Sequence, residues 1–306
     1  MIYLTKILKL ISLTRNCLYS LKFFAVNINR GRIFMGDMLT TEKITVEYDI
    51  NINKMSLVSV IMLFILRVPL LGFSGFIVND KSMSLIYTIF MIGTYFFSAL
   101  FLWLERGHLK DYHVDIIAII IFALGPFWYL YSNLIIRIPM MIIGVGLLIA
   151  LKISKCKFQK VTLANIKWIF IGLAIGAITA IVSSPLLSKQ VTNTGMKATA
   201  SIVVVSFLTQ LTNAAIFEEP FFRGILWGVL KKYKCKDLWI CLIQAGLFWI
   251  SHIYYINSSP YSFWIVVPLG GVVLGILSWR SRSIGTSMAA HGMINGLGQV
   301  LTFYKF

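Results

Sequence analysis

Nine long apolar stretches constrain this chain more than any other feature of its sequence. They lie near residues 55–78, 84–104, 114–131, 137–152, 163–183, 198–220, 238–256, 262–278 and 284–303. About 20 apolar residues in a helix cross the hydrocarbon layer of a bilayer, and lipid cannot satisfy the hydrogen bonds of an irregular backbone. We therefore predict an all-α fold, a polytopic transmembrane helical bundle with about 8–9 spans.

The charge content supports a lipid environment. Only 13% of the 306 residues are charged, about half of the roughly 25% typical of soluble domains. This deficit excludes a soluble enzyme. The net charge of +17 does not indicate a nucleic-acid partner, because the basic residues lie between the apolar stretches. The cysteines form no CxxC pair and predict neither a disulfide framework nor a metal site; they are Cys17, Cys156, Cys235 and Cys241.

The basic residues also predict the orientation of the chain. Alternate loops are rich in lysine and arginine, around residues 105–110, 152–160, 231–236 and 280–282, whereas the other loops are sparse. The positive-inside rule places the basic loops and the N-terminus in the cytoplasm and the C-terminus outside.

The chain divides into three predicted regions. Residues 1–50 interleave basic and apolar residues, which is typical of an interfacial amphipathic helix. An over-extended reading frame explains them equally well, since Met35, Met38 and Met55 are alternative starts. Residues 51–160 are predicted to form N-terminal transmembrane helices, and residues 161–306 the functional core.

Two adjacent carboxylates lie within the sixth apolar stretch, well before the next basic loop at residues 231–236. Inserting a charged side chain into the membrane at such a position costs about 2.5–3.5 kcal/mol or more of free energy. We therefore predict that Glu218 and Glu219 serve a function. Glu219 and Arg223 are i,i+4 and share a helical face, which favours an ion pair that either serves a site or merely holds helices together. Glu218 points about 100° away and is free to activate water. Pro220 predicts a kink between them and the rest of the helix.

Two histidines also lie within apolar stretches. His252 shares a helical face with Phe248, and His291 shares one with Asn295. The depth of each residue in the membrane follows from the number of helical residues between it and the nearest basic loop. The depths of His252, His291, Asn295 and Glu218 overlap, so these side chains can share one cavity. The other two histidines, His108 and His113, lie in a loop and are expected to be solvated.

Several further polar or small residues are expected to serve packing. Arg67 next to Pro69 predicts a broken helix or a snorkelling side chain. Glycine pairs with small-xxx-small spacing favour close helix approach; they are Gly271 with Gly275 and Gly292 with Gly296. Three amides either line a cavity or form interhelical hydrogen bonds: Gln210, Asn213 and Gln244.

In chain order the buried clusters read Glu218-Glu219-Pro-Phe-Phe-Arg223, Phe248-Trp-Ile-Ser-His252 and His291-Gly-Met-Ile-Asn295. These EExxxR, FxxxH and HxxxN motifs, each in a separate apolar stretch, make residues 163–303 resemble the CPBP family of intramembrane proteases. That family includes type II CAAX prenyl endopeptidases and bacterial proteins linked to bacteriocin processing or self-immunity.

The resemblance implies a role for each motif residue. Glu218 and His252 would activate a water molecule, and His291 and Asn295 would stabilise the oxyanion. Glu219, Arg223 and Phe248 would support them. Family members have been described both as metal-dependent and as metal-free, and if zinc is used its ligands would be Glu218, His252 and His291.

We therefore predict an intramembrane endopeptidase that cleaves a peptide or a membrane-anchored protein in the lipid bilayer, in a polar cavity that opens toward the cytoplasm. Two other classes stay open on the residues alone. One is a non-catalytic membrane immunity or adaptor protein in which the polar cluster holds helices. The other is a proton-coupled transporter in which Glu218 and the histidines relay protons.

Overall fold

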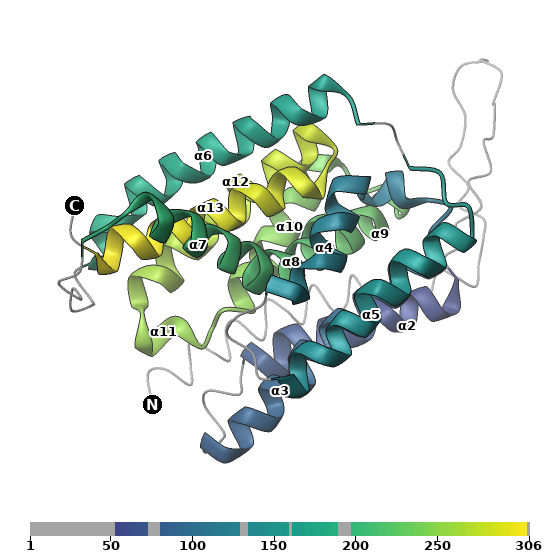
Figure 1. Ribbon diagram of the computed structural model, residues 1–306, viewed down its shortest axis with the longest axis horizontal. Helices are drawn as coiled ribbons and strands as arrows, with labels where there is room; N and C mark the ends of the chain where they lie inside the picture. The colour runs from purple at the N-terminus through teal and green to yellow at the C-terminus, as the bar shows by residue number, and fades with distance from the viewer. Residues whose placement is uncertain (1–52, 73–79, 129–133, 159–160, 189–196, 305–306) are drawn as a thin grey trace, which may run out of the picture. The chain divides into compact units, whose positions relative to one another are not determined.

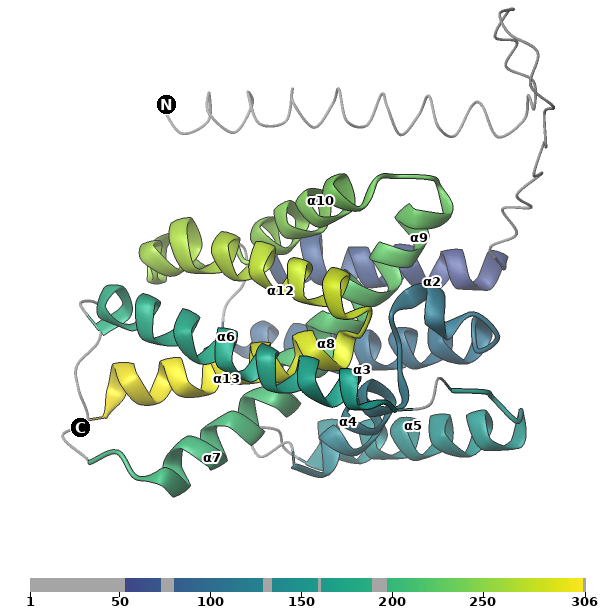
Figure 2. The same ribbon diagram turned by 90° about the horizontal axis from the view of Figure 1, so that it is seen from above.

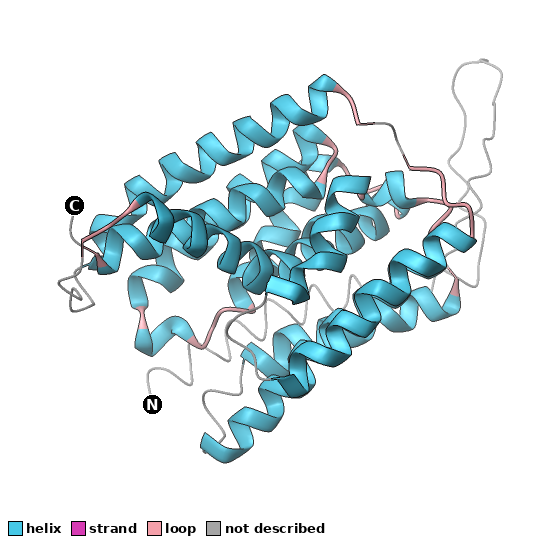
Figure 3. Ribbon diagram, in the orientation of Figure 1, coloured by secondary structure: helices cyan, strands magenta, loops and turns pink. Residues whose placement is uncertain are grey.

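The computed structural model describes residues 53–72, 80–128, 134–158, 161–188 and 197–304, and every regular element in these ranges is a helix (Figure 3). The predicted all-α fold is confirmed. The predicted N-terminal extension, residues 1–50, lies outside the described residues, and the division into three regions stays a prediction.

Among the described residues, six helical segments are long and apolar enough to cross a membrane. They are Lys54–Gly72, Ser84–Leu104, Leu134–Ile153, Leu163–Pro185, Ala200–Lys232 and Ser262–Ser281. Large apolar side chains cover their outer surfaces, with Leu163 85% and Ile153 74% exposed. A soluble monomer rarely exposes so much apolar surface. These features fit a multi-pass integral membrane protein, although the predicted number of spans is not confirmed.

The first half of the described chain consists of α2 (Lys54–Ile65), the π-helical turn η1 (Leu66–Gly72), α3 (Asp80–Leu104), the short η2 (Leu109–Tyr112), α4 (Ile116–Trp128), α5 (Leu134–Ile153) and α6 (Leu163–Ser188). Helix α6 packs against α13 (Ile284–Phe303) and α12 (Val267–Ser281) of the second half. Helix α3 packs against α2 and α5 (Figure 1). Pro69 lies inside η1 and cannot donate a backbone hydrogen bond. The broken helix predicted there takes the form of an uninterrupted change from α-helix to π-helical turn.

A run of successive helical elements carries the paired carboxylates. It consists of α7 (Ala200–Gln210), η3 (Leu211–Ala215), α8 (Ile216–Glu219), η4 (Pro220–Ile225) and α9 (Leu226–Lys232). Both η3 and η4 are π-helical, so α8 is one α-turn between two wider turns. The irregularity predicted at Pro220 therefore takes the form of a change in helical type. Such π-turns are frequent at functional sites.

The last helix, α13 (Ile284–Phe303), lies at the centre of the second half. It follows α10 (Asp237–Ile250), α11 (Tyr255–Ser258), η5 (Ser262–Val266) and α12 (Val267–Ser281). It packs against α6, α7 and α12 (Figures 1 and 2), and most of its residues are buried. Because protein rather than lipid surrounds α13, this helix tolerates polar side chains such as His291.

Glycines let α13 approach its neighbours closely. A Cβ atom on Gly296 would lie 2.6 Å from the Cα atom of Phe207 in α7. Where α6 packs against α13, a Cβ atom on Gly176 would lie 2.6 Å from the carbonyl oxygen of Ala290. The packing role predicted for the Gly292 and Gly296 pair is confirmed.

The loop histidines differ in environment. His108 is exposed, as expected. The Nδ1 atom of His113 lies 3.2 Å from the Ser278 hydroxyl, and its ring packs 5.4 Å from that of Trp227. Burial, together with the positive charge of Arg282, lowers the pKa of His113 to about 4. The expectation of a solvated side chain is wrong for His113, because α9 and α12 cover it.

The glycine contact gives a direct stability test. We expect Gly296→Ala to lower the free energy of unfolding by about 1–3 kcal/mol, because the new methyl group meets backbone that cannot rotate away. Gly298→Ala is the matched control, since nothing lies within 4 Å of a Cβ atom there. Thermal unfolding in detergent measures both, and equal stability of the two variants would contradict the close packing of α7 on α13.

Candidate active site

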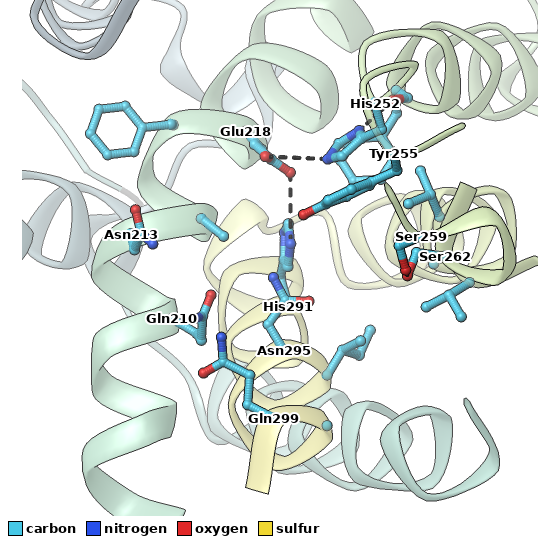
Figure 4. A pocket seen from close by; sticks show the side chains of 18 of the residues that line it. Gln210, Asn213, Glu218, His252, Tyr255, Ser259, Ser262, His291, Asn295 and Gln299 are labelled. Atoms are coloured by element: carbon cyan, nitrogen blue, oxygen red, sulfur yellow. Dashed lines mark hydrogen bonds and ion pairs between the residues drawn. The ribbon is translucent and has the colours of Figure 1, made fainter. Parts of the chain in front are cut away.

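One cavity brings together the four residues that the motifs single out as catalytic. It has a volume of about 770 Å³, and its walls include Glu218, His252, His291 and Asn295 (Figure 4). These residues come from α8, from the turn after α10 and from α13. The cavity thus joins side chains from separate helices, as the motifs required. Their catalytic roles stay predictions.

Glu218 lies between the two histidines. Its Oε1 atom is 3.6 Å from Nε2 of His252, and its Oε2 atom is 3.7 Å from Nε2 of His291. Both distances are too long for a direct hydrogen bond. Oε2 is buried and has no hydrogen-bond partner among the described residues. At each of these separations, one hydrogen-bond donor can bridge the carboxylate oxygen and the imidazole nitrogen.

His252 presents an acceptor to the cavity. Its Nδ1 atom lies 2.8 Å from the carbonyl oxygen of Phe248. A carbonyl only accepts, so Nδ1 carries the hydrogen and Nε2 of the neutral ring holds a lone pair that faces Glu218. The ring stacks with Tyr255 at 5.8 Å, and the Tyr255 hydroxyl points toward His291 (Figure 4).

His291 is held by the supporting ion pair. Its Nδ1 atom lies 2.8 Å from Oε1 of Glu219, which also accepts a hydrogen bond of 3.0 Å from Nη1 of Arg223. Glu219 and Arg223 are fully buried behind the cavity. The predicted i,i+4 ion pair is therefore present, and it orients His291.

Arg223 links this pair to the other helices. Its Nη2 atom donates to the carbonyl oxygen of Gly271, and its guanidinium lies 4.3 Å from the centre of the Phe248 ring. Phe248 in turn contacts the rings of His252 and His291, at 4.6 and 6.1 Å. The three residues expected to support the site thus connect both histidines.

The polar amides divide between the two expected roles. Gln210 and Asn213 line the cavity (Figure 4). Gln244 is fully buried outside the cavity wall and donates to the carbonyl oxygens of Cys241 and Gly271, so it joins α10 to α12. Of these three amides, Gln210 and Asn213 are placed where they can contact a bound molecule.

Arg67 is a site residue that the sequence reasoning missed. It is 3% exposed, and its Nη2 atom donates to Oε1 of Glu218 and lies 3.4 Å from Nε2 of His252. Its guanidinium also lies 5.3 Å from the centre of the Phe90 ring. The snorkelling side chain expected here is wrong, because the π-helical turn η1 directs Arg67 inward. Arg67 could have been identified from the sequence, because it is a charged residue inside an apolar stretch. The same criterion identified Glu218.

The three proposed zinc ligands do not fit a metal ion in this arrangement. The cationic guanidinium of Arg67 lies between Glu218 and His252, where it would repel a divalent ion. Within the described ranges, no group of three or more His, Cys, Asp or Glu side chains is arranged to hold a metal ion. We therefore derive no step through zinc.

The cavity lies at the end of the helices that is remote from the basic loops. Its wall extends to residues next to the sparse loops and to the last turn of α13; these include Ser183, Ser259, Ser262, Gln299 and Thr302. The basic loops lie at the opposite helix ends, around residues 231–236 and 280–282. This lining therefore does not support the expectation that the cavity opens on the side of the basic loops.

Comparison with known proteins gives one match. Residues 200–297 match the family model described as type II CAAX prenyl endopeptidase Rce1-like. No curated protein and no solved structure matches the chain significantly. The matched segment contains all three motifs and all four of the cavity residues singled out by sequence, whereas Arg67 lies outside it. Residues 200–297 are therefore similar to the family of type II CAAX prenyl endopeptidase Rce1-like proteins.

Proposed function

We propose that this protein is an intramembrane endopeptidase that hydrolyses a peptide bond in a membrane-associated peptide or protein. The observation that carries the proposal is the convergence of Glu218, His252, His291 and Asn295 on one cavity within a segment similar to a protease family. A buried carboxylate beside two imidazoles and an amide is a set of groups suited to general base catalysis and to oxyanion stabilisation.

In the proposed reaction, Glu218 takes a proton from a water molecule as the water oxygen attacks the scissile carbonyl carbon. The oxyanion that forms accepts hydrogen bonds from His291 and Asn295. A protonated His291 uses Nδ1–H for Glu219 and Nε2–H for the oxyanion, and the carboxylate of Glu219 stabilises its charge. When the C–N bond breaks, Glu218 returns the proton to the leaving nitrogen. His252 supports Glu218 in this step.

The proposed substrate enters from the membrane face opposite the basic loops. This follows from the position of the cavity wall and from the positive-inside rule, which assigns the basic loops to the cytoplasm. A peptide or anchored protein exposed on the non-cytoplasmic side is the substrate class that such an entrance favours.

Removal of the proposed base tests the enzymatic function. We expect Glu218→Gln to lower kcat by at least about 10²-fold, because an amide cannot accept the proton of water. Cleavage of a fluorogenic peptide library by purified protein in liposomes measures this. Asp111→Asn, an exposed acid outside the cavity, is the control and should be fully active.

The same experiment separates the protease from the adaptor class. A wild-type protein that cleaves nothing while Glu218→Gln keeps its biological effect would support a non-catalytic immunity or adaptor protein. Cleavage at the wild-type rate by Glu218→Gln would remove Glu218 from the mechanism.

Metal removal gives a second test of the site. We expect zinc chelators to leave the cleavage rate unchanged, because Arg67 holds the space between Glu218 and His252. The rate is followed in the liposome assay before and after chelation. Loss of activity that added zinc restores would show that the arginine leaves this position and that a metal replaces it.

The side of the entrance can be measured by cysteine labelling. In a chain whose four native cysteines are replaced by serine, a membrane-impermeant maleimide added to intact cells should label Asn257→Cys, which is exposed near cavity residue Ser259. It should not label Lys157→Cys in a basic loop until the cells are opened. The reverse pattern would place the cavity entrance in the cytoplasm.

A further inference from the structure

We propose that Arg67 is a positioning residue of the active site: it binds one oxygen of Glu218 and Nε2 of His252, and thereby leaves the other oxygen, Oε2, as the base that takes the proton from water. This inference rests on the proposed peptidase function. It adds a residue from the first described helical segment, far outside the matched residues 200–297, to the site.

The first argument is the pairing of acceptors beside His252. Glu218 Oε1 and His252 Nε2 both carry lone pairs and lie 3.6 Å apart. Two acceptors at this separation need a donor between them. Arg67 Nη2 carries two hydrogens and contacts both atoms, so one amino group satisfies both acceptors. A water molecule bridging the same two atoms would compete with this guanidinium.

The second argument is the contrast with the other side of Glu218. Oε2 lies 3.7 Å from His291 Nε2, and none of the described residues donates a hydrogen bond to it. This gap has nearly the width of the one that Arg67 bridges. A water molecule held here by Oε2 would lie beside His291 and one helical turn from Asn295, the two groups proposed to bind the oxyanion.

The third argument is charge. Glu218 and Glu219 are two buried carboxylates, and Arg67 and Arg223 are two buried guanidiniums. Their charges sum to zero when both imidazoles are neutral. Arg67 is the only lysine or arginine among the described residues that line the cavity. In that state Arg67 is the counter-ion of Glu218, and its loss would favour the neutral form of the buried carboxyl group, which cannot act as a base.

A role in binding the C-terminal carboxylate of a substrate fits less well. The Nη2 atom of Arg67 contacts Glu218 and His252 directly, so protein groups rather than a substrate carboxylate occupy it. At this position the guanidinium acts on the base.

The fold explains how Arg67 is held. The π-helical turn η1 contains Pro69, and it packs against the end of α10 at Gly72, close to the carbonyl oxygens of Ile250 and Ser251. This contact brings η1 beside His252. The face of Phe90 in α3 then supports the guanidinium from the other side.

Kinetics of Arg67 variants in liposomes test the proposal. With the best-cleaved fluorogenic peptide, we expect Arg67→Ala to lower kcat by about 10- to 100-fold, with KM changed much less, as for the loss of a charge-assisted hydrogen bond. Millimolar guanidinium should restore part of the rate, because it can enter the cavity and rebind Glu218, whereas sodium chloride at equal concentration should not. Arg67→Lys should retain intermediate activity.

Controls separate this inference from the proposed function. Arg137→Gln removes another arginine of the apolar segments, one that does not line the cavity, and should keep wild-type kcat. If wild type cleaves, Glu218→Gln does not, and folded Arg67→Ala has wild-type kcat, the inference fails and the peptidase function stands. If wild type itself does not cleave, both fail.

Two further outcomes are decisive. If Arg67→Ala does not fold, Arg67→Gln takes its place, and wild-type kcat in that variant overturns the proposal. If a folded variant is inactive and neither guanidinium nor Arg67→Lys restores activity, Arg67 only holds the π-helical turn η1, and the proposal is also overturned.

Discussion

The structure depends on the pairing of charges that are removed from water. An ion moved into a low-dielectric interior costs several kcal/mol unless an opposite charge and hydrogen bonds compensate it. This protein buries two carboxylates side by side, and each contacts its own guanidinium: Glu218 meets Arg67, and Glu219 meets Arg223. The two helical irregularities at Pro69 and Pro220 lie next to members of these pairs, so backbone geometry and charge compensation are coupled.

Neighbouring positions on one helix give the two carboxylates different tasks. Successive residues on a helix point about 100° apart, so Glu218 faces the cavity while Glu219 faces the packed interior. Glu219 and Arg223 hold His291 and Phe248 in place without lining the cavity. A site built in this way keeps one carboxylate accessible to a water molecule and uses the other to fix the surrounding side chains.

The cavity extends beyond the segment that matches the family model. Residues 200–297 supply the motif residues, and the glycines of α13 let α7 approach the helix that carries His291 and Asn295. Arg67 comes from η1, in the first described helical segment, and Phe90 of α3 supports it. The N-terminal helices therefore contribute a charged side chain to the cavity wall.

The sequence by itself determined the helical class and the ion pair of Glu219 with Arg223, because an apolar run needs internal hydrogen bonds and helical periodicity sets which residues share a face. The residues expected to share the cavity came from the resemblance of three motifs to a protease family, since depth along separate helices only permits such a meeting. Tertiary structure alone decided that Arg67, 151 positions from Glu218 in the chain, would bind it, and that the cavity would extend away from the basic loops. Periodicity orients a side chain on its own helix, but only the packing of helices decides which side chain it meets.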